Sequence, residues 1–286
     1  MERRTVELIF ERNKGLLLKH YKPQDKPTAF LLGGQPASGK SSLQSDPSVL
    51  GINGDLYRVF HPDFARLLLD PQTYSQETQI FSNVFTERMI EEVSERRLNV
   101  SIEGTMRNKK VPENTAEYFH KKGYRVVVRC IAAPGLFTGI NVYYRYAEEI
   151  AVNGYGRLAD MDVHDEAVAE LPHTIDHLYD NKFVDEIQVY DIFGKDEVAH
   201  YELLNDEWNL LKKPGEIIEE TRENQLKQLP LAAQFIERAN ESMRQFREDD
   251  PIREQIEERS ERLSKWVKDN ILIEKNTPPK RKGRRI

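Results

Sequence analysis

Short apolar runs alternate along the chain with longer segments of mixed polarity. An apolar run that ends in glycine, as at residues 28–34, is typical of a strand buried on both faces of a parallel sheet. The pattern predicts strands at residues 28–34, 98–103, 124–131 and 184–190, with a weaker one at 50–52. The mixed segments predict helices at residues 61–70, 79–97, 112–122, 136–152 and 164–181. Strands that alternate with helices indicate an α/β fold with a mainly parallel sheet flanked by helices.

The two ends of the chain have a different pattern. Residues 1–27 predict one helix, because apolar positions recur at helical spacing until Pro23 and Pro27. Beyond about residue 205 the strand pattern disappears, and two amphipathic helices are expected on either side of Pro251. We expect a core with the N-terminal helix at residues 1–205, a helical appendage at 206–270, packed on the core or partly free, and a basic, disordered tail at 271–286.

Composition and charge narrow the class of protein. Of the 286 residues, 38% are hydrophobic and 31% are charged, which excludes a disordered polymer. The formal net charge of −6 excludes the general basic field that nucleic-acid binding needs. The single cysteine, Cys130, cannot form an internal disulfide, and no apolar run is long enough to cross a membrane. We expect a cytoplasmic protein that binds neither nucleic acid nor membrane.

A phosphate-binding loop follows the first predicted strand. It reads Gly34, Gln35, Pro36, Ala37, Ser38, Gly39, Lys40 and Ser41, a complete match to G-x-x-x-x-G-K-[ST]. Its backbone N–H groups can surround a β-phosphate at the start of a following helix, and Lys40 can reach the β- and γ-phosphates. The Ser41 hydroxyl can bind Mg²⁺. A flexible glycine turn is the alternative, but such a turn needs neither the lysine nor the hydroxyl at these positions.

Two acids follow neighbouring predicted strands at the same edge of the sheet. Asp55 comes after the weak strand at 50–52 and can orient or deprotonate an acceptor hydroxyl. Its alternative role is turn formation, because Asn-Gly-Asp is a common turn sequence. Glu103 ends the next strand and can support Mg²⁺ through a water molecule, or can cap the following helix instead.

Phosphoryl transfer also needs cations from a segment that closes over the site. Arg145 lies in a predicted helix, and Arg157 follows Gly154 and Gly156, which permit a lid hinge. Both arginines are candidates for this role, although isolated arginines are mostly solvated. Thr105 and Arg107, just after the third strand, are candidates to hold a polar substrate.

Several stretches together resemble the zeta toxin family, the toxins of bacterial toxin–antitoxin pairs. They are the phosphate loop with its strand, residues 53–64 (N-G-D-L-Y-R-V-F-H-P-D-F), residues 102–107 (I-E-G-T-M-R) and residues 133–146. The resemblance covers about residues 6–200 and implies a P-loop kinase-like core. It implies transfer of a phosphoryl group from ATP or GTP, with Mg²⁺, to the 3′-hydroxyl of the amino sugar in UDP-N-acetylglucosamine. That reaction would block cell-wall synthesis, and a separate antitoxin protein would restrain it.

The resemblance also implies roles for individual residues. Lys40 and Ser41 bind the triphosphate and metal, Asp55 is the base on the sugar hydroxyl, and Arg145 and Arg157 neutralise the transferring phosphoryl group. Residues at the family's sugar-nucleotide positions are Glu91, Glu103, Thr105 and Arg107. The sequence departs from the family pattern at two places that affect these assignments. The segment from Glu91 to the Glu103 strand is shorter than in the family, and the lid sequence at 152–157 differs, which can change the UDP-sugar that is accepted.

Two other functions remain open from the sequence. A P-loop kinase acting on another nucleotide or small metabolite would carry the same phosphate loop. A nucleotide-binding module without catalysis would also carry it, because a P-loop alone does not define a reaction.

Overall fold

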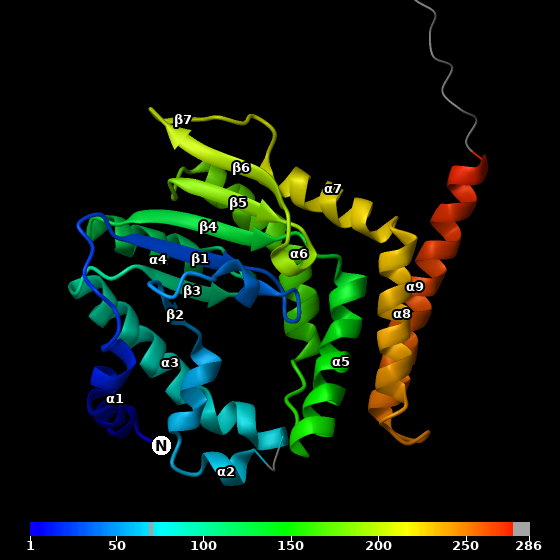
Figure 1. Ribbon diagram of the computed structural model, residues 1–286, viewed down its shortest axis with the longest axis horizontal. Coiled ribbons are helices and arrows are strands. Elements are labelled where there is room, and N and C mark those ends of the chain that lie inside the picture. The colour runs from blue at the N-terminus through cyan, green and yellow to red at the C-terminus, as the bar shows by residue number, and fades with distance from the viewer. Residues whose placement is uncertain (69–70, 277–286) are drawn as a thin grey trace, which may run out of the picture.

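The computed structural model describes residues 1–68 and 71–276, and its centre is one twisted sheet with helices packed around it (Figure 1). The sheet has seven strands in the order β2-β3-β1-β4-β5-β6-β7. Strands β1 to β5 are parallel, whereas β6 and β7 add antiparallel strands at one edge. The predicted α/β class with a mainly parallel sheet is confirmed.

The bounds of the elements are as follows. The strands are β1 Thr28–Gly33, β2 Leu50–Ile52, β3 Val100–Gly104, β4 Arg125–Ile131, β5 Glu186–Tyr190, β6 Glu197–Leu204 and β7 Glu207–Trp208. The α-helices are α1 Arg3–Leu18, α2 Phe64–Leu67, α3 Pro71–Glu95, α4 Lys110–Lys121, α5 Gly135–Asn153, α6 Met161–Asp180, α7 Pro214–Leu226, α8 Leu229–Met243 and α9 Pro251–Asn276. None of the helices in these described ranges is long and apolar enough to span a bilayer.

Alternate side chains of the central strand β1 enter two different hydrophobic cores. Ala29 and Leu31 pack in the larger core with residues of α1, α3, α4 and α6. Leu32 packs in a second core, which residues of α5, α8 and α9 complete. Because β1 is covered in this way on both faces, its continuous apolar run is explained.

The C-terminal helices are packed on the core. Phe137 of α5 and Phe235 of α8 stack with their ring centroids 4.4 Å apart and their planes within 4°. Tyr143 of α5 donates a hydrogen bond to Gln255 of α9 at 2.9 Å. Figure 1 shows α8 and α9 as a long pair beside α5. Of the two arrangements expected for the appendage, the packed one is found.

Some predicted elements differ in extent. Of the helix expected at 61–70, the described residues hold only the short α2, and a 3-10 helix, Gly54–Phe60, precedes it. Residues 206–270 hold the small strand β7 and the additional helix α7, so the expectation of two helices without strands is wrong. Helix α9 continues to residue 276. Residues 277–286, the rest of the expected tail, lie outside the described residues.

Candidate active site

The phosphate loop begins where the central strand ends. Gly33, the last residue of β1, is in register with Gly104 at the end of β3, so the loop leaves the sheet at its carboxyl edge. A Cβ atom on Gly34 would lie 2.7 Å from Ser38 Oγ, and Gly39 adopts φ 96° in the left-handed region. Both positions therefore require glycine.

Two polar groups of this loop fit a bound phosphate. Lys40 folds back over the loop and donates a hydrogen bond to the carbonyl oxygen of Gln35 at 3.0 Å. Ser38 is fully buried, and its hydroxyl has no hydrogen-bond partner among the described residues. A buried hydroxyl on a glycine-rich loop can donate to a phosphate oxygen. The residues present thus fit a nucleoside triphosphate.

The segment after the loop differs from the expectation. A helix was predicted to start there, but the structure has a 3-10 helix of 4 residues, Lys40–Leu43. Pro47 and the start of β2 at Leu50 follow so soon that a longer helix does not fit. A longer helix would direct its positive dipole end at the phosphates. Here the loop amides and nearby side-chain cations have to supply that charge.

Four of the predicted site residues influence one another electrostatically. Burial, the largest influence, lowers the pKa of Lys40 to about 8, and the charge of Arg145 also lowers it. The charges of Glu103 and Asp55 act in the opposite direction on Lys40. Burial raises the pKa of Glu103, while the charge of Lys40 limits that rise. Two acids and two cations thus lie within electrostatic reach of one another.

Asp55 lies at the start of the 3-10 helix after β2 and pairs with two arginines. Its carboxylate is 3.0 Å from Arg58 and 2.5 Å from Arg157. Burial by itself raises the pKa of Asp55, but hydrogen bonds and charge from Arg157 and Arg58 outweigh it and hold the pKa below its usual value. An ionised carboxylate with two cations attached is a weak base. Asp55 can therefore act on a hydroxyl only after Arg157 has moved away.

The two candidate lid arginines lie within α5 and just after it. Arg145 is 60% exposed and its guanidinium lies 3.8 Å from Glu149. Helix α5 ends at Gly154, with φ 78°, and the backbone N–H of Arg157 then donates to Glu149 at 2.8 Å. Exposed ion pairs are weak. Both arginines can therefore exchange their present carboxylates for a phosphoryl group.

A cavity of about 480 Å³ opens beside the end of β3. Glu103, Thr105 and Arg107 line it, together with Glu166 of α6 and residues of α4. Two of these lining residues, Arg107 and Glu166, form an ion pair at 2.7 Å. Three of the four residues predicted to bind substrate thus share one cavity, and Glu103 links it electrostatically to Lys40.

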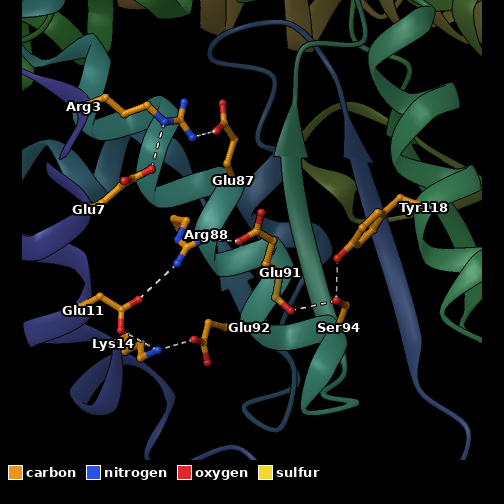
Figure 2. A network of polar contacts seen from close by, with 10 residues as sticks. All are labelled: Arg3, Glu7, Glu11, Lys14, Glu87, Arg88, Glu91, Glu92, Ser94 and Tyr118. Carbon is orange, nitrogen blue, oxygen red and sulfur yellow. Dashed lines mark hydrogen bonds and ion pairs between the residues drawn. The ribbon is translucent and has the colours of Figure 1, made fainter.

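Glu91, the fourth of these residues, lies elsewhere. Its exposed carboxylate pairs with Arg88 at 2.7 Å on the surface of α3. Figure 2 shows this pair in the network that joins α3 to Glu11 of α1. The side of α3 next to the Asp55 segment instead carries Ser82, which lies against Gly54. Because the helical rotation from 82 to 91 is about two and a half turns, Glu91 points to the opposite side. The structure does not bring it to the region of Lys40, Asp55, Glu103 and the cavity, which is called the cleft below.

Sequence reasoning missed two residues that organise the acids. Arg58 is only 4% exposed and donates to both Asp55 and Thr78. Asn53 accepts a hydrogen bond from the backbone N–H of Asp55 at 3.0 Å and donates to Glu103 at 3.1 Å. The turn signal at Asn53 was visible in the sequence. Its bridge to Glu103 was not, because it depends on the pairing of β2 with β3.

Ser41 and Glu103 are the residues that could support Mg²⁺. The described ranges contain no group of three or more His, Cys, Asp or Glu residues that could hold a metal ion without other ligands. A magnesium ion at a phosphate loop takes part of its ligands from the phosphates and water, so it needs few protein groups. The exposed Ser41 at the end of the loop fits that requirement.

Comparison with known proteins gives one consistent family. The family model described as zeta toxin matches residues 14–205. A toxin zeta from Enterococcus hirae is 33% identical over 186 residues, which cover 62% of this chain and 65% of that protein. The chain thus spans slightly less than two thirds of that relative's length. Toxin PezT from Streptococcus pneumoniae serotype 4 is 28% identical over 244 residues, which cover 75% of this chain and 92% of that protein.

Solved structures share the fold. A structure of the PezAT chromosomal toxin–antitoxin system of Streptococcus pneumoniae superposes with a TM-score of 0.71 at 23% identity, covering 85% of this chain and 98% of that one. The AvrRxo1-ORF1:-ORF2 complex with ATP gives a TM-score of 0.52 at 12% identity, covering 93% and 89%. At these identities the likeness shows the fold alone.

Proposed function

This chain belongs to the zeta toxin family, and from that premise we propose that it is a kinase that inhibits growth. It transfers the γ-phosphoryl group of ATP or GTP to the 3′-hydroxyl of the amino sugar in UDP-N-acetylglucosamine or a related UDP-sugar. The reaction takes place in the cytoplasm, where the triphosphate is available. Loss of this sugar nucleotide blocks cell-wall synthesis.

The observation that carries the proposal is the convergence of two acids and two cations beside the phosphate loop. Lys40, Asp55, Glu103 and Arg145 affect one another's charge, and Arg157 pairs with Asp55. A plain nucleotide-binding loop needs Lys40 but has no use for Asp55, whose charge acts on Lys40. An acid that faces the phosphates across a cleft supports transfer to a hydroxyl.

Each residue of the cleft has a defined task in this reaction. The loop amides, Ser38 and Lys40 would hold the phosphates, and Ser41 would hold Mg²⁺, which Glu103 could support through water. When bound, Mg²⁺ neutralises phosphate charge. Arg145 and Arg157 turn from their carboxylates to the phosphoryl group, which carries the negative charge of the transition state.

The movement of Arg157 also activates Asp55. Once Arg157 leaves, one of the two influences that lower the pKa of Asp55 is removed, so the carboxylate becomes a better base. The acceptor oxygen then bonds to the γ-phosphorus, the bond from phosphorus to the β,γ-bridging oxygen breaks, and Asp55 takes the hydroxyl proton. Arrival of the phosphoryl group and activation of the base are thus coupled.

The cavity at the end of β3 supports a sugar nucleotide as the acceptor. Its volume of about 480 Å³ is within the usual range for a small-molecule site. Arg107 offers a cation for a diphosphate, and Thr105 and Glu103 offer hydrogen bonds for sugar hydroxyls. The Arg107–Glu166 pair has to open for a diphosphate to reach the guanidinium.

Two relatives support the donor and the partner. The AvrRxo1 complex was solved with ATP, and PezAT is a toxin–antitoxin system. From these two similarities we assign ATP as a phosphoryl donor for this chain and a separate antitoxin protein as its partner. That antitoxin restrains the kinase in the cell.

Mass spectrometry of the products tests the function. The protein is incubated with Mg²⁺, ATP or GTP, and UDP-N-acetylglucosamine, and we expect one added phosphoryl group on the sugar. UDP-N-acetylmuramic acid is the matched control, because its 3′-oxygen already carries a lactyl ether and cannot accept. Lys40→Ala is the enzyme control.

The other outcomes separate the alternatives. Phosphorylation of a different compound from a metabolite extract, with the UDP-sugars unchanged, identifies a different kinase. ATP binding without any transfer identifies a binding module. Either result overturns the proposal.

A further inference from the structure

We propose that the C-terminal helices α8 and α9 hold the phosphate loop in its nucleotide-binding shape, with Arg238 and Arg259 as positioning residues. This inference rests on the proposed function, because it assigns a task within the same site. Neither arginine lies in the cleft; each acts through side chains that end on the loop. Figure 1 shows how α8 and α9 lie along α5. Helix α5 carries two of the intermediate residues, Asn141 and Thr138.

The first connection runs from α8 to the middle of the loop. Arg238 donates to the side-chain oxygen of Asn141 at 2.9 Å, and the amide nitrogen of Asn141 donates to the carbonyl oxygen of Ala37 at 2.9 Å. Asn141 is 7% exposed, so both bonds are shielded from water. Ala37 has φ 61°, which is unfavourable for a residue with a side chain. The bond from Asn141 holds the loop at this strained residue.

The same arginine also supports the loop through an aromatic stack. The Arg238 guanidinium lies 5.4 Å from the ring centre of Phe193 and 5.0 Å from that of Phe235. Phe193 has φ 70°, and its backbone N–H donates to the carbonyl oxygen of Ser38 at 3.3 Å. A Cβ atom on Gly39 would lie 2.9 Å from Phe193 Cα. Arg238 of the appendage thus packs on Phe193, and Phe193 in turn contacts the loop.

The second connection runs from α9 to the start of the loop. Arg259 pairs with Asp165 at 3.0 Å, and the ring of His164 bonds to Asp165 at 2.7 Å and to the Thr138 hydroxyl at 2.8 Å. Gln35 donates to the same hydroxyl at 3.2 Å. Burial lowers the pKa of His164, although Asp165 opposes this, so the ring is neutral and can donate on one side and accept on the other. The Thr138 hydroxyl and both ring nitrogens of His164 therefore have donor or acceptor roles that fit.

The short turn after the loop explains why such support is needed. In a P-loop protein a full helix after the loop fixes its last residues, but here only the 3-10 helix Lys40–Leu43 follows. Without more hydrogen-bonded turns the loop has to be fixed from the side. The two connections reach Gln35 and Ala37, and the stack reaches Ser38 and Gly39. Together, the two connections and the stack restrain most of the loop residues that precede Lys40.

Hydrogen exchange of the ligand-free, full-length protein tests the support directly. Arg238→Ala and Asn141→Ala should each raise the exchange rate of the peptide covering residues 34–42 about five- to tenfold, the effect of one lost hydrogen bond. Arg238→Lys, which keeps a donor and a cation, should recover part of the protection. Arg244→Ala, an exposed arginine at the end of α8, is the matched control and should leave the peptide unchanged.

Asn141→Asp separates support of the loop from simple docking of the helix. The carboxylate keeps the contact to Arg238 but turns an acceptor toward the carbonyl oxygen of Ala37. We expect this variant to loosen the loop as much as Asn141→Ala. Wild-type protection of residues 34–42 in Asn141→Asp would overturn the proposal.

Titration with MgATP in the absence of acceptor gives the functional readout. The dissociation constant should rise about five- to tenfold in Arg238→Ala and Asn141→Ala, and about two- to fivefold in Arg259→Ala, whose salt bridge is partly exposed. Exposed Arg262 on the same helix is the control for Arg259. A lower melting temperature with unchanged exchange of residues 34–42 and unchanged affinity would show a merely structural role and overturn the proposal. If the wild-type protein bound no MgATP, the proposed function would fail, while the exchange result would still decide the support of the loop.

Discussion

The helices at the two ends of the chain are attached to the core in different ways. N-terminal α1 lies on α3, with Phe10 buried against Phe85. Figure 2 shows the ion pairs that also join these two helices. C-terminal α8 lies on α5, with Phe235 buried against Phe137. Its polar contacts are more shielded and lead to the phosphate loop. The apolar anchors are thus alike, whereas the polar contacts differ in burial and in where they end.

The difference shows how burial decides the strength of the interaction between charged groups. Arg3 and Arg88 pair with glutamates at the surface, where water and salt compete for the same groups. Beside the phosphate loop, burial shifts the pKa of Lys40, Asp55 and Glu103, and the charge of each neighbour also contributes. Substitutions in the two regions should therefore have effects of different size and kind.

The largest expected effect is at the cleft. Asp55→Asn removes the group that takes the hydroxyl proton and should lower kcat by about 10²–10⁴-fold while both substrates still bind. Steady-state kinetics with isothermal titration checks both parts. Asp63→Asn, an exposed acid after the same 3-10 helix, is the control and should be nearly silent. A collapse of MgATP affinity in Asp55→Asn would instead make Asp55 a metal or folding residue.

Loss of the buried aromatic ring should lower the free energy of unfolding by similar amounts at the two ends of the chain. Phe10→Ala and Phe235→Ala each remove a fully buried ring and should lower the free energy of unfolding by about 3–5 kcal/mol. Denaturant unfolding measures this loss. Only Phe235→Ala should also weaken MgATP binding under folding conditions. Equal weakening by both variants would remove the distinction between the two ends.

The pKa values of Lys40 and Lys14 are shifted in opposite directions, which can be tested by changing the pH. Burial lowers the pKa of Lys40 to about 8, whereas hydrogen bonds with Glu11 and Glu92 raise the pKa of Lys14. The ligand-free cleft loses the Lys40 proton as pH rises above about 8, so MgATP affinity should fall about tenfold per pH unit there. Lys40→Arg should remove this fall, and Lys14→Met should leave it unchanged. An affinity that stays flat to pH 10 would contradict a buried lysine at the phosphates.

The same shift has a stability consequence of known sign. Between pH 8 and the ordinary lysine value of about 10.4 the unfolded chain holds more protons than the folded one at Lys40. The contribution of Lys40 to the free energy of unfolding therefore rises with pH in this window.

The smallest effects are expected in the network of Figure 2. Arg88→Ala should change the free energy of unfolding by no more than about 0.5 kcal/mol, because its ion pairs are exposed. Glu91→Gln should leave kcat and the KM for the UDP-sugar within about twofold of wild type. A KM that rises tenfold for Glu91→Gln would instead support the role that the family resemblance implied.

Local patterns made the sheet and the phosphate loop predictable. A buried parallel strand is a short apolar run, and the loop motif is contiguous, so both can be read without knowing the fold. Strand β6 was missed because Glu197–Leu204 mixes polar with apolar positions, as expected for a strand near the edge of a sheet. Helix α7 was missed as a separate helix because its many charges give only a weak apolar face.

The candidate site was predictable where it depends on strand ends. Asp55, Glu103 and Arg107 follow neighbouring strands, and the order of the sheet brings such positions together. The place of Glu91 depends on the rotation of a long helix, which the sequence does not fix. The contacts of Arg238 and Arg259 join parts of the chain that lie 97 and 94 positions apart. No local signal reports such a pairing.

The second hydrophobic core has a consequence for shortening the chain. The family match ends at residue 205, yet Phe137, Ile140 and Tyr143 of α5 are covered by side chains from beyond that point. Removing everything after 205 would expose an apolar strip along α5 next to the cleft. Such a strip promotes self-association. Sequence similarity thus marks a shared ancestry here, but it does not mark a point at which the protein can be cut and kept in solution.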